Sequence, residues 1–342
     1  MADRPVSNEL PRAKSAPPNT AVSQPSSGHD TGHGTGHDTS HALAYASIFL
    51  VTCLFAGNFL AGKFALLGFA PPALAQLRVA AAALMLAGIF LAHGRHSRVP
   101  SGLKEWLFLA LLASLGITIN QLCFVTGLGR TSVLHAGLIG GLGPIIIFGL
   151  SVATGVEKLT LLKSTGTLIS LGGIVLFVTQ KSGPGAQASL VGDAIVFAGT
   201  VAFSGCTTLE KRIAGKYDHL TLNAFVFGLG ALLMLPFTVR SVAAVSWSAV
   251  PLRAWRGLGF MALGGSVIAY VLYAFALSRL TASKVGAFAY VQPILVAILA
   301  VLFTNEHVTM MEVVGGAFVL LGMYLAGRPP ARNFHRLAHG GA

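Results

Sequence analysis

Polar side chains are scarce in this sequence, and the few that interrupt its apolar stretches are the residues that could do chemistry. They are amides, phenols, one imidazole and one amine, which can hydrogen-bond a small polar molecule. Polar groups inside apolar segments usually face the protein interior or a water-filled cavity. We therefore expect a polar cavity lined by Asn58, Gln121, His135, Tyr270, Tyr273, Lys284, Tyr290 and Gln292.

Each of these residues also has a plainer interpretation. A single buried polar group often forms one hydrogen bond between helices and contacts no ligand. Lys284 lies near the end of an apolar stretch, from which its ammonium can reach the aqueous interface.

Three charged residues allow either a gating role or a structural one. Arg78 lies inside an apolar stretch, where an arginine costs roughly 2.5–3.5 kcal/mol, so it must reach the interface, pair with a carbonyl or contact an anionic ligand. Glu157 and Glu306 lie near the starts of apolar stretches, where a carboxylate stabilises a helix N-terminus. A gate or a proton relay is the alternative. No acid lies in the middle of an apolar stretch, so the sequence identifies no coupling ion.

Two prolines interrupt apolar stretches at matching places. Proline removes a backbone hydrogen-bond donor and crowds the preceding turn, and a carbonyl freed inside a membrane must face protein or water. We expect the segments around Pro144 and Pro293 to flex beside the cavity, with Gly137, Gly141 and Gly286 as small neighbours. Close packing of helices through small residues is the alternative, and both interpretations can hold together.

No metal, cofactor or catalytic site is predicted. The eleven acidic residues are scattered, and the sequence contains neither a His-Glu-x-x-His motif nor a Gly-x-x-x-x-Gly-Lys-Ser/Thr loop. Four histidines near the start of the chain could bind zinc or nickel weakly, although we expect a disordered tract there. They are His29, His33, His37 and His41.

The elements that must position these residues are membrane-spanning helices. The chain has 342 residues, of which 54% are hydrophobic and 10% charged, whereas soluble domains carry about 25% charged residues. We predict an all-α integral membrane protein that lies in a lipid bilayer. Its excess of 12 positive charges lies at the ends of the spans, where cations are favoured, and we therefore expect it to bind no nucleic acid. A span needs about 20 apolar residues. The ten predicted spans are 43–66, 72–92, 105–127, 131–154, 160–179, 190–212, 219–239, 256–277, 281–303 and 308–327.

The second half of the chain repeats the first at an offset of 149 residues. Without a gap, 14 of the 60 positions over 116–175 match the positions over 265–324. A duplicated membrane unit is typical of secondary transporters, whose substrate site lies between the copies. The matched polar pairs are Gln121 with Tyr270 and His135 with Lys284.

The distribution of lysine and arginine predicts the orientation. With the N-terminus in the cytoplasm, sixteen cations lie on the cytoplasmic side and six on the far side. We therefore expect both termini in the cytoplasm and the chain in the cell (inner or plasma) membrane. Each copy holds five predicted spans, an odd number, so the second copy enters the membrane inverted. Inverted repeats let one binding site open to either side.

Four regions follow from this pattern. Residues 1–41 are rich in Pro, Ser, Gly, Thr and His and cannot bury enough surface to order themselves, so we expect a disordered cytoplasmic tail. The two five-span repeats occupy residues 42–180 and 190–328, and residues 329–342 form a short basic tail. The pattern indicates a small-molecule substrate as partner and says nothing of the oligomeric state.

Several motifs resemble those of one transporter family. The stretch CLFAGNFLAGKFALLGFAPPALAQLR over 53–78 is similar to the family's opening helix. Later, GLGRTSVLHAGLIGGLGPIIIFGLSVATGVEKLT is repeated in outline by ALSRLTASKVGAFAYVQPILVAILAVLFTNEHVT, and Gly192-Asp193 matches the usual start of the second unit. The chain thereby resembles the drug/metabolite transporter superfamily, specifically its ten-helix EamA-type exporters, over residues 43–327. Phe55, where many members carry Trp, and the long His-containing tail depart from the family pattern.

The resemblance implies two inverted five-helix EamA repeats and a carrier of small metabolites such as amino acids or nucleobase-like compounds. Alternating access is the expected mechanism and export the expected direction. Two other classes stay open as alternatives. An integral-membrane enzyme would need clustered acids or His–acid sets, and a channel-like facilitator would need a continuous polar stripe; the sequence displays neither.

Overall fold

The computed structural model describes residues 35–93, 99–155, 160–178, 189–213, 215–280, 284–285, 288–304, 306 and 308–327. Every regular element in these ranges is helical. The first repeat contains α1 (Thr35–Ala65), α2 (Pro71–His93), α3 (Leu103–Ala113), η1 (Ser114–Ile119), α4 (Asn120–Leu128), α5 (Val133–Gly140), α6 (Gly143–Ala153) and α7 (Leu161–Val178). The second contains α8 (Leu190–Glu210), η2 (Lys211–Ile213), α9 (His219–Ala243), η3 (Trp247–Ala249), α10 (Leu252–Gly259), η4 (Phe260–Ile268), α11 (Ala269–Arg279), η5 (Phe288–Tyr290), α13 (Gln292–Phe303) and α14 (Met310–Gly327).

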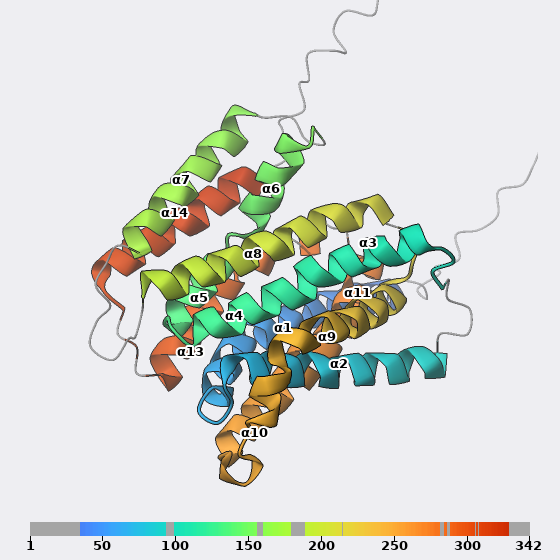
Figure 1. Cartoon of the computed structure of the whole chain (residues 1–342). Helices are drawn as coiled ribbons and strands as arrows, with labels where there is room; N and C mark the ends of the chain where they lie inside the picture. Colours follow the sequence, from blue (N-terminus) through green and yellow to red (C-terminus); the bar gives the residue numbers. More distant parts are fainter. Residues whose placement is uncertain are drawn as a thin grey trace, which may run out of the picture. The chain divides into compact units, whose positions relative to one another are not determined.

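The helices follow the predicted spans in order (Figure 1). Within the described residues, seven helical segments are long and apolar enough to cross a membrane. Three shorter apolar helices occupy the places of predicted spans five, nine and ten: Leu161–Leu176, Phe288–Phe303 and Met310–Ala326. The prediction of an all-α membrane protein with two repeats is confirmed.

The first helix begins earlier than the sequence predicts. α1 starts at Thr35, so residues 35–41, which were expected to belong to the disordered tail, continue the helix that leads into the first span. Once an apolar span has nucleated a helix, each further residue adds a backbone hydrogen bond. This gain explains how a polar segment can extend the helix.

Apolar side chains are buried between helices and also exposed along their outer faces. The largest core cluster joins α2, α3, α9 and η4 through Leu86, Leu112, Phe227 and Met261, all almost completely buried. Elsewhere, large apolar residues are open to the surroundings, as Leu84 is at 76% exposure. Exposed apolar surface on this scale fits helices that are solvated by lipid.

Helices of the two repeats pack against their own counterparts. α2 packs against α9, and α7 packs against α14. α14 covers the range of α7 shifted by 149 residues, and α9 covers nearly that of α2. α5 of span four packs against α13 of span nine. Figure 1 shows α7 and α14 side by side along their lengths.

The contact between α7 and α14 is made by matched glycines. A Cβ built on Gly166 would lie 2.7 Å from the carbonyl oxygen of Gly322, and one on Gly173 would lie 2.7 Å from that of Gly315. Only glycine permits backbones this close. In the repeat, Gly166 falls on Gly315 and Gly173 on Gly322. Exchanging the two copies therefore exchanges the two contacts.

A hydrogen bond marks the middle of this crossing. The Ser170 hydroxyl donates to the carbonyl oxygen of Val319 at 2.8 Å, and Val319 is the residue on which Ser170 falls in the repeat. Residues later in α7 meet residues earlier in α14, so the two helices are antiparallel. A self-complementary contact of this kind is what a two-fold axis produces.

Spans four and nine are both interrupted. α5 ends and α6 begins a few residues later, with Pro144 in the first turn of α6. In span nine, η5 precedes α13, which has Pro293 in its first turn. The sequence suggested prolines within flexing helices; instead each proline starts a new helix, where the missing N–H has no intrahelical partner to lose. Both spans are therefore interrupted at matching places.

Spans three and eight share a second irregularity. η1 and η4 are π-helical and cover matching positions. A Cβ on Gly116 in η1 would lie 2.6 Å from Sγ of Cys206, and one on Gly265 in η4 would lie 2.5 Å from Oδ1 of Asn58. π-helical turns occur frequently at functional sites. Here they lead directly into α4 and α11, which carry matched polar residues.

Candidate functional site

A buried arginine connects two of the predicted cavity residues. Arg78 on α2 is 4% exposed, and its Nη1 donates to Oε1 of Gln121 on α4 at 2.8 Å. Its charge also acts on the hydroxyl of Tyr270 on α11, and its guanidinium carbon lies 5.9 Å from the ring centre of Phe124. Since Gln121 and Tyr270 are matched in the repeat, Arg78 lies where the two counterparts converge. We call Arg78, Gln121 and Tyr270 the arginine cluster.

The surroundings of the arginine cluster are largely aromatic. The rings of Phe55 and Phe227 meet Tyr270 edge to face, with centroids 6.1 and 5.6 Å away. Glu210 on α8 acts electrostatically on the same hydroxyl. Nε of Arg78 is buried and has no hydrogen-bond partner among the described residues. A buried donor without a partner is costly, so this N–H is a candidate contact for a ligand.

Two other predicted cavity residues lie near these helices. Asn58 on α1 is buried, and its Oδ1 has no hydrogen-bond partner within the described ranges. It faces the π-helical segment of span eight at Gly265. Tyr273 on α11 is 37% exposed and is influenced by Glu210. Spans one, two, three and eight thus contribute polar groups to one region.

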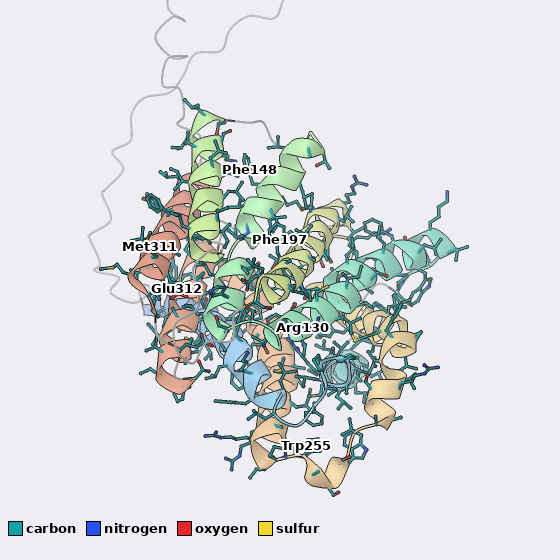
Figure 2. All side chains as sticks on the ribbon, turned by 60° about the vertical axis from the view of Figure 1, so that its left-hand side comes forward. Arg130, Phe148, Phe197, Trp255, Met311 and Glu312 are labelled. Carbon is teal, nitrogen blue, oxygen red and sulfur yellow. The ribbon has the colours of Figure 1, made fainter. Side chains whose placement is uncertain are left out.

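A second polar group surrounds the predicted imidazole. Nδ1 of His135 on α5 lies 2.9 Å from Oδ2 of Asp193 on α8, and its Nε2 lies 3.5 Å from Oε1 of Glu312 on α14. Glu312 is labelled in Figure 2. The Thr131 hydroxyl donates to the other carboxylate oxygen of Asp193. His135, Asp193 and Glu312 are 1%, 4% and 3% exposed. Charged groups buried this completely persist only with partners.

The first turn of α5 is capped by a residue from the second repeat. The backbone N–H groups of Val133 and Leu134 donate to the two carboxylate oxygens of Glu306 at 2.8 and 3.0 Å. The Ser132 hydroxyl accepts from the N–H of His135 at 3.0 Å. Carboxylates are favourable there because the N–H groups lack intrahelical partners and the helix dipole is positive. The expected capping by Glu306 is present, but on a helix of the other copy.

Glu312 also caps its own helix. Its Oε2 accepts from the N–H of Thr309 at 2.6 Å, and its N–H donates to the Thr309 hydroxyl at 3.2 Å. This reciprocal pair is a capping box. One oxygen of the carboxylate therefore fixes the start of α14, and the other faces His135.

Lys63 lies close to the same group. Its Nζ donates to the carbonyl oxygens of Leu128 and Thr131 at 3.0 and 2.6 Å, which satisfies carbonyls at the end of α4. The charge of Glu306 acts on this ammonium. The histidine cluster, as we call it, comprises Lys63, His135, Asp193, Glu306 and Glu312.

The sequence prediction missed two acids of this cluster. Asp193 and Glu312 each lie in the first turn of a helix, where an acid is expected to cap the helix and face water. Packing against α5 buries them. The repeat held one signal: Glu312 falls on Lys163 and His135 on Lys284, so the imidazole of the first copy and the acid of the second each fall on a lysine.

The remaining predicted residues lie elsewhere or outside the described ranges. Lys284 is exposed, and its Nζ lies 5.8 Å from the ring centre of Tyr45, so it does not join His135. Tyr290 at the end of η5 and Gln292 at the start of α13 are half-buried. In the part of the chain described, no three His, Cys, Asp or Glu side chains could hold a metal ion. Glu157, Gly286, His29 and His33 lie outside the described residues, as do the side chains of His37 and His41.

The two interrupted spans touch at their small residues. A Cβ on Gly137 would lie 2.3 Å from Cγ1 of Val296, and one on Gly141 would lie 2.7 Å from Cγ of Pro293. Close packing, the alternative interpretation of these glycines, is therefore present. It occurs directly beside both helix interruptions.

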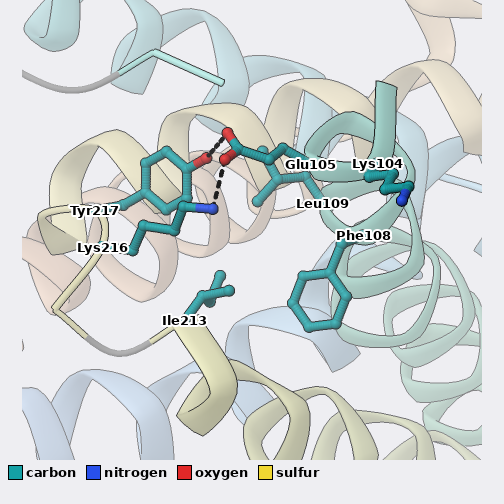
Figure 3. Close-up of a pocket in the computed structure, with 7 residues that line it drawn as sticks. All are labelled: Lys104, Glu105, Phe108, Leu109, Ile213, Lys216 and Tyr217. Atoms are coloured by element: carbon teal, nitrogen blue, oxygen red, sulfur yellow. Dashed lines mark hydrogen bonds and ion pairs between the residues drawn. The ribbon is translucent and has the colours of Figure 1, made fainter. Parts of the chain in front are cut away.

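A pocket of about 290 Å³ opens between α3 and the segment that joins α8 to α9 (Figure 3). Nζ of Lys216 donates to Oε1 of Glu105 at 2.5 Å, and the Tyr217 hydroxyl donates to Oε2 at 2.8 Å. Glu105 belongs to the first repeat and its two partners to the second. These bonds join the repeats near the starts of α3 and α9, away from the helix ends that meet at the histidine cluster.

Replacement of Glu306 by glutamine tests the cap of α5. The amide keeps one acceptor oxygen but directs an NH₂ group at the second backbone donor. Because hydrogen bonds to charged groups contribute about 1.5–3 kcal/mol, we expect the purified variant to unfold at a measurably lower temperature. A thermal melt followed by tryptophan fluorescence in detergent checks this. An unchanged melting temperature would remove Glu306 from the stability of α5.

An apolar helical chain with an internal repeat, interrupted helices in matching spans and buried polar clusters belongs to the class of multi-pass membrane transporters built from repeats. The EamA-like transporter family matches residues 42–179 and again residues 190–328. The chain belongs to this family, and it is a membrane transporter rather than an enzyme.

Two relatives and one solved structure illustrate the similarity. An uncharacterized transporter of Archaeoglobus fulgidus is 28% identical over 278 residues, covering 81% of this chain and 94% of the relative. A WAT1-related protein of Arabidopsis thaliana is 26% identical and covers 65% of this chain and 67% of the relative. One crystal structure matches the fold with a TM-score of 0.59 at 17% identity, covering 85% of this chain and 98% of that one.

Proposed function

We propose that the protein is a secondary transporter that exports a small metabolite, such as an amino acid or a nucleobase-like compound, across the cytoplasmic membrane by alternating access. The observation that carries this proposal is the meeting of two interrupted spans at Gly137, Gly141 and Pro293. In repeat-built carriers, discontinuous helices in corresponding positions flank the substrate site. Rocking of one copy against the other opens that site to alternate sides.

The self-complementary crossing of α7 and α14 supports an inverted arrangement of the copies. Its helices are antiparallel, and its contacts exchange when the copies exchange. An axis that relates antiparallel spans lies in the membrane plane. With both termini in the cytoplasm, the pocket at Glu105 faces the cytoplasm and the histidine cluster lies toward the outer side.

The arginine cluster is the proposed substrate contact. Arg78 offers a buried N–H without a partner in the described chain, and Gln121 and Tyr270 add polar groups beside aromatic rings. A guanidinium recognises a carboxylate or phosphate through paired hydrogen bonds. We therefore expect the transported metabolite to carry an anionic group, such as the carboxylate of an amino acid, next to an apolar or aromatic part.

Metabolite profiling tests the proposed function. Medium from cells that overproduce the protein is compared with medium from cells that produce a Gly137→Leu variant at equal levels. We expect one compound class to accumulate outside only with the functional protein, and the purified protein in liposomes to show saturable counterflow of that compound. Counterflow is a property of carriers and not of channels, so flux without it would favour the channel-like facilitator.

Cross-linking the pocket tests alternating access. The native cysteines Cys53, Cys123 and Cys206 are first replaced by serine. The substitutions Glu105→Cys and Lys216→Cys are then introduced together. A bifunctional thiol reagent that contains a disulfide links the two new cysteines. We expect bridging to stop counterflow by fixing the repeats in one state, and reduction to restore it. Each single-cysteine variant with the same reagent is the control. Undiminished counterflow in the bridged protein would contradict movement at this pocket.

A further inference from the structure

We infer that His135, held between Asp193 and Glu312, is a reversible proton-binding site through which proton movement drives transport. The proton-binding part stands on the geometry of the histidine cluster, and the coupling part rests on the proposed function. The ligand is the hydrogen ion itself, taken up from the aqueous side toward which the histidine cluster lies.

The first argument concerns the two ring nitrogens. Nδ1 faces a carboxylate oxygen of Asp193 at 2.9 Å, and Nε2 faces one of Glu312 at 3.5 Å. A neutral imidazole has a single N–H, so one of its nitrogens would direct a lone pair at a carboxylate. The protonated ring has an N–H on each nitrogen. Uptake of one proton therefore converts an unfavourable contact into a favourable one.

The second argument concerns the charge of the histidine cluster. Asp193, Glu306 and Glu312 are three buried carboxylates, and among the described residues Lys63 supplies the ammonium that lies beside them. With the ring neutral and the acids ionised, the group has an excess of two negative charges. Burying uncompensated charge away from water is expensive. A proton on His135 halves this excess.

The other elements packed around α5 supply little further charge. On α13, which contacts α5, the residues from Gln292 to Phe303 include no titratable side chain. Arg130 at the end of α4 is exposed, and the ammonium of Lys163 on α7 lies 4.9 Å from the ring centre of Phe148. The carboxylates of Asp193 and Glu312 are therefore the charged groups that face the ring of His135 directly.

The position of α5 links this site to the moving parts. α5 carries His135 near its start and ends at the interruption that meets Pro293. Its partners Asp193 and Glu312 lie on α8 and α14 of the other repeat. With the proton bound, both contacts hold α5 to the second repeat. Loss of the proton weakens both contacts. This biases the equilibrium between the two arrangements of the repeats that alternate during transport.

The contact between His135 of the first copy and Glu312 of the second is not repeated by the matched residues. The repeat places Lys284 where the first copy has His135 and Lys163 where the second copy has Glu312, and Lys284 is exposed. A cluster that merely closed one end of the protein could be repeated at the other end. A titratable group at a single end instead gives the two sides of the membrane different roles in the cycle.

Histidine resonances provide a direct test that needs no substrate. Wild-type protein labelled with ¹⁵N-histidine is titrated in lipid nanodiscs from about pH 5 to about pH 8, the range in which histidine changes charge. The signal of His135 is assigned by its loss in His135→Gln, and His219→Gln, which alters an exposed histidine at the start of α9, is the matched control. We expect the His135 signal to move with pH, and Asp193→Asn to weaken its proton binding at least about tenfold.

The titration does not depend on the folding of one variant. If His135→Gln cannot be purified, the signal that responds to both Asp193→Asn and Glu312→Gln identifies His135. A His135 signal that stays fixed over the whole titration, or that ignores both acid replacements, overturns the proton-binding site.

Coupling is tested with the compound found by metabolite profiling. Liposomes that contain pyranine report proton movement while they take up this compound. We expect uptake by the wild type to carry protons and to follow an imposed pH gradient, and His135→Gln to lose the response to the gradient while counterflow continues. If uptake by the wild type does not respond to the pH gradient, proton coupling is overturned, but the proposed transport function stands. A protein that moves no compound overturns the proposed function, and the histidine titration still decides the proton site.

Discussion

Replacement of Gly137 by leucine is expected to reduce transport at least tenfold while the protein still inserts into the membrane. A single Cβ at this position would already lie 2.3 Å from Cγ1 of Val296. Overpacking costs about 1–3 kcal/mol for modest additions, and an isobutyl group adds more. The added volume separates α5 from α13 at the point where both spans are interrupted. Counterflow in liposomes and membrane insertion measured by fractionation check the two parts.

Gly149 offers the matched control for this variant. It lies on α6, in the same span as Gly137, and a Cβ built on it meets nothing within 4 Å. Gly149→Leu should insert and transport like the wild type. Equal transport by Gly137→Leu and Gly149→Leu would show that the α5–α13 contact has no part in the mechanism.

Replacement of Gln121 by glutamate is expected to block an anionic substrate without unfolding the protein. The new carboxylate would lie at hydrogen-bond distance from Nη1 of Arg78, where Oε1 of Gln121 now accepts. Two opposite charges about 4 Å apart near a protein surface attract by roughly 4 kcal/mol, so the glutamate competes with the anionic group of the substrate. We expect the apparent KM to rise at least about tenfold with no loss of melting temperature.

A second variant separates the added charge from the lost hydrogen bond. Gln121→Met keeps the volume and removes the acceptor, so Arg78 stays available to an anion. Its apparent KM should remain well below that of Gln121→Glu. If both variants transport like the wild type, Arg78 is a structural residue and the substrate binds elsewhere.

The sequence predicted the fold well because membrane spans leave a strong signal. Long apolar stretches, and a gap-free repeat that pairs Gly166 with Gly315, can be found without tertiary information. The pairing of Gln121 with Tyr270 predicted one shared region; in the structure Gln121 accepts a hydrogen bond from Arg78, and Arg78 and Tyr270 interact electrostatically. Here the repeat supplied the long-range information that single-residue patterns lack.

The histidine cluster could not be predicted in the same way. Asp193 and Glu312 lie near helix starts, where acids commonly cap helices and face water. Their burial results from the packing of α8 and α14 around α5. Local sequence patterns do not predict such long-range packing. The same holds for Glu306, whose N–H partners lie 173 and 172 residues away along the chain. Local sequence around an acid indicates a capping tendency but not which helix will be capped.

The crossing of α7 and α14 has a consequence for the origin of the chain. Because exchanging the two copies exchanges the two glycine contacts, nothing in this interface requires two different polypeptides. A half-length ancestor inserted in both orientations could have built the same contact by pairing with itself. After gene duplication and fusion, each half could then diverge independently. The lysines and acids that differ between the two copies result from that divergence.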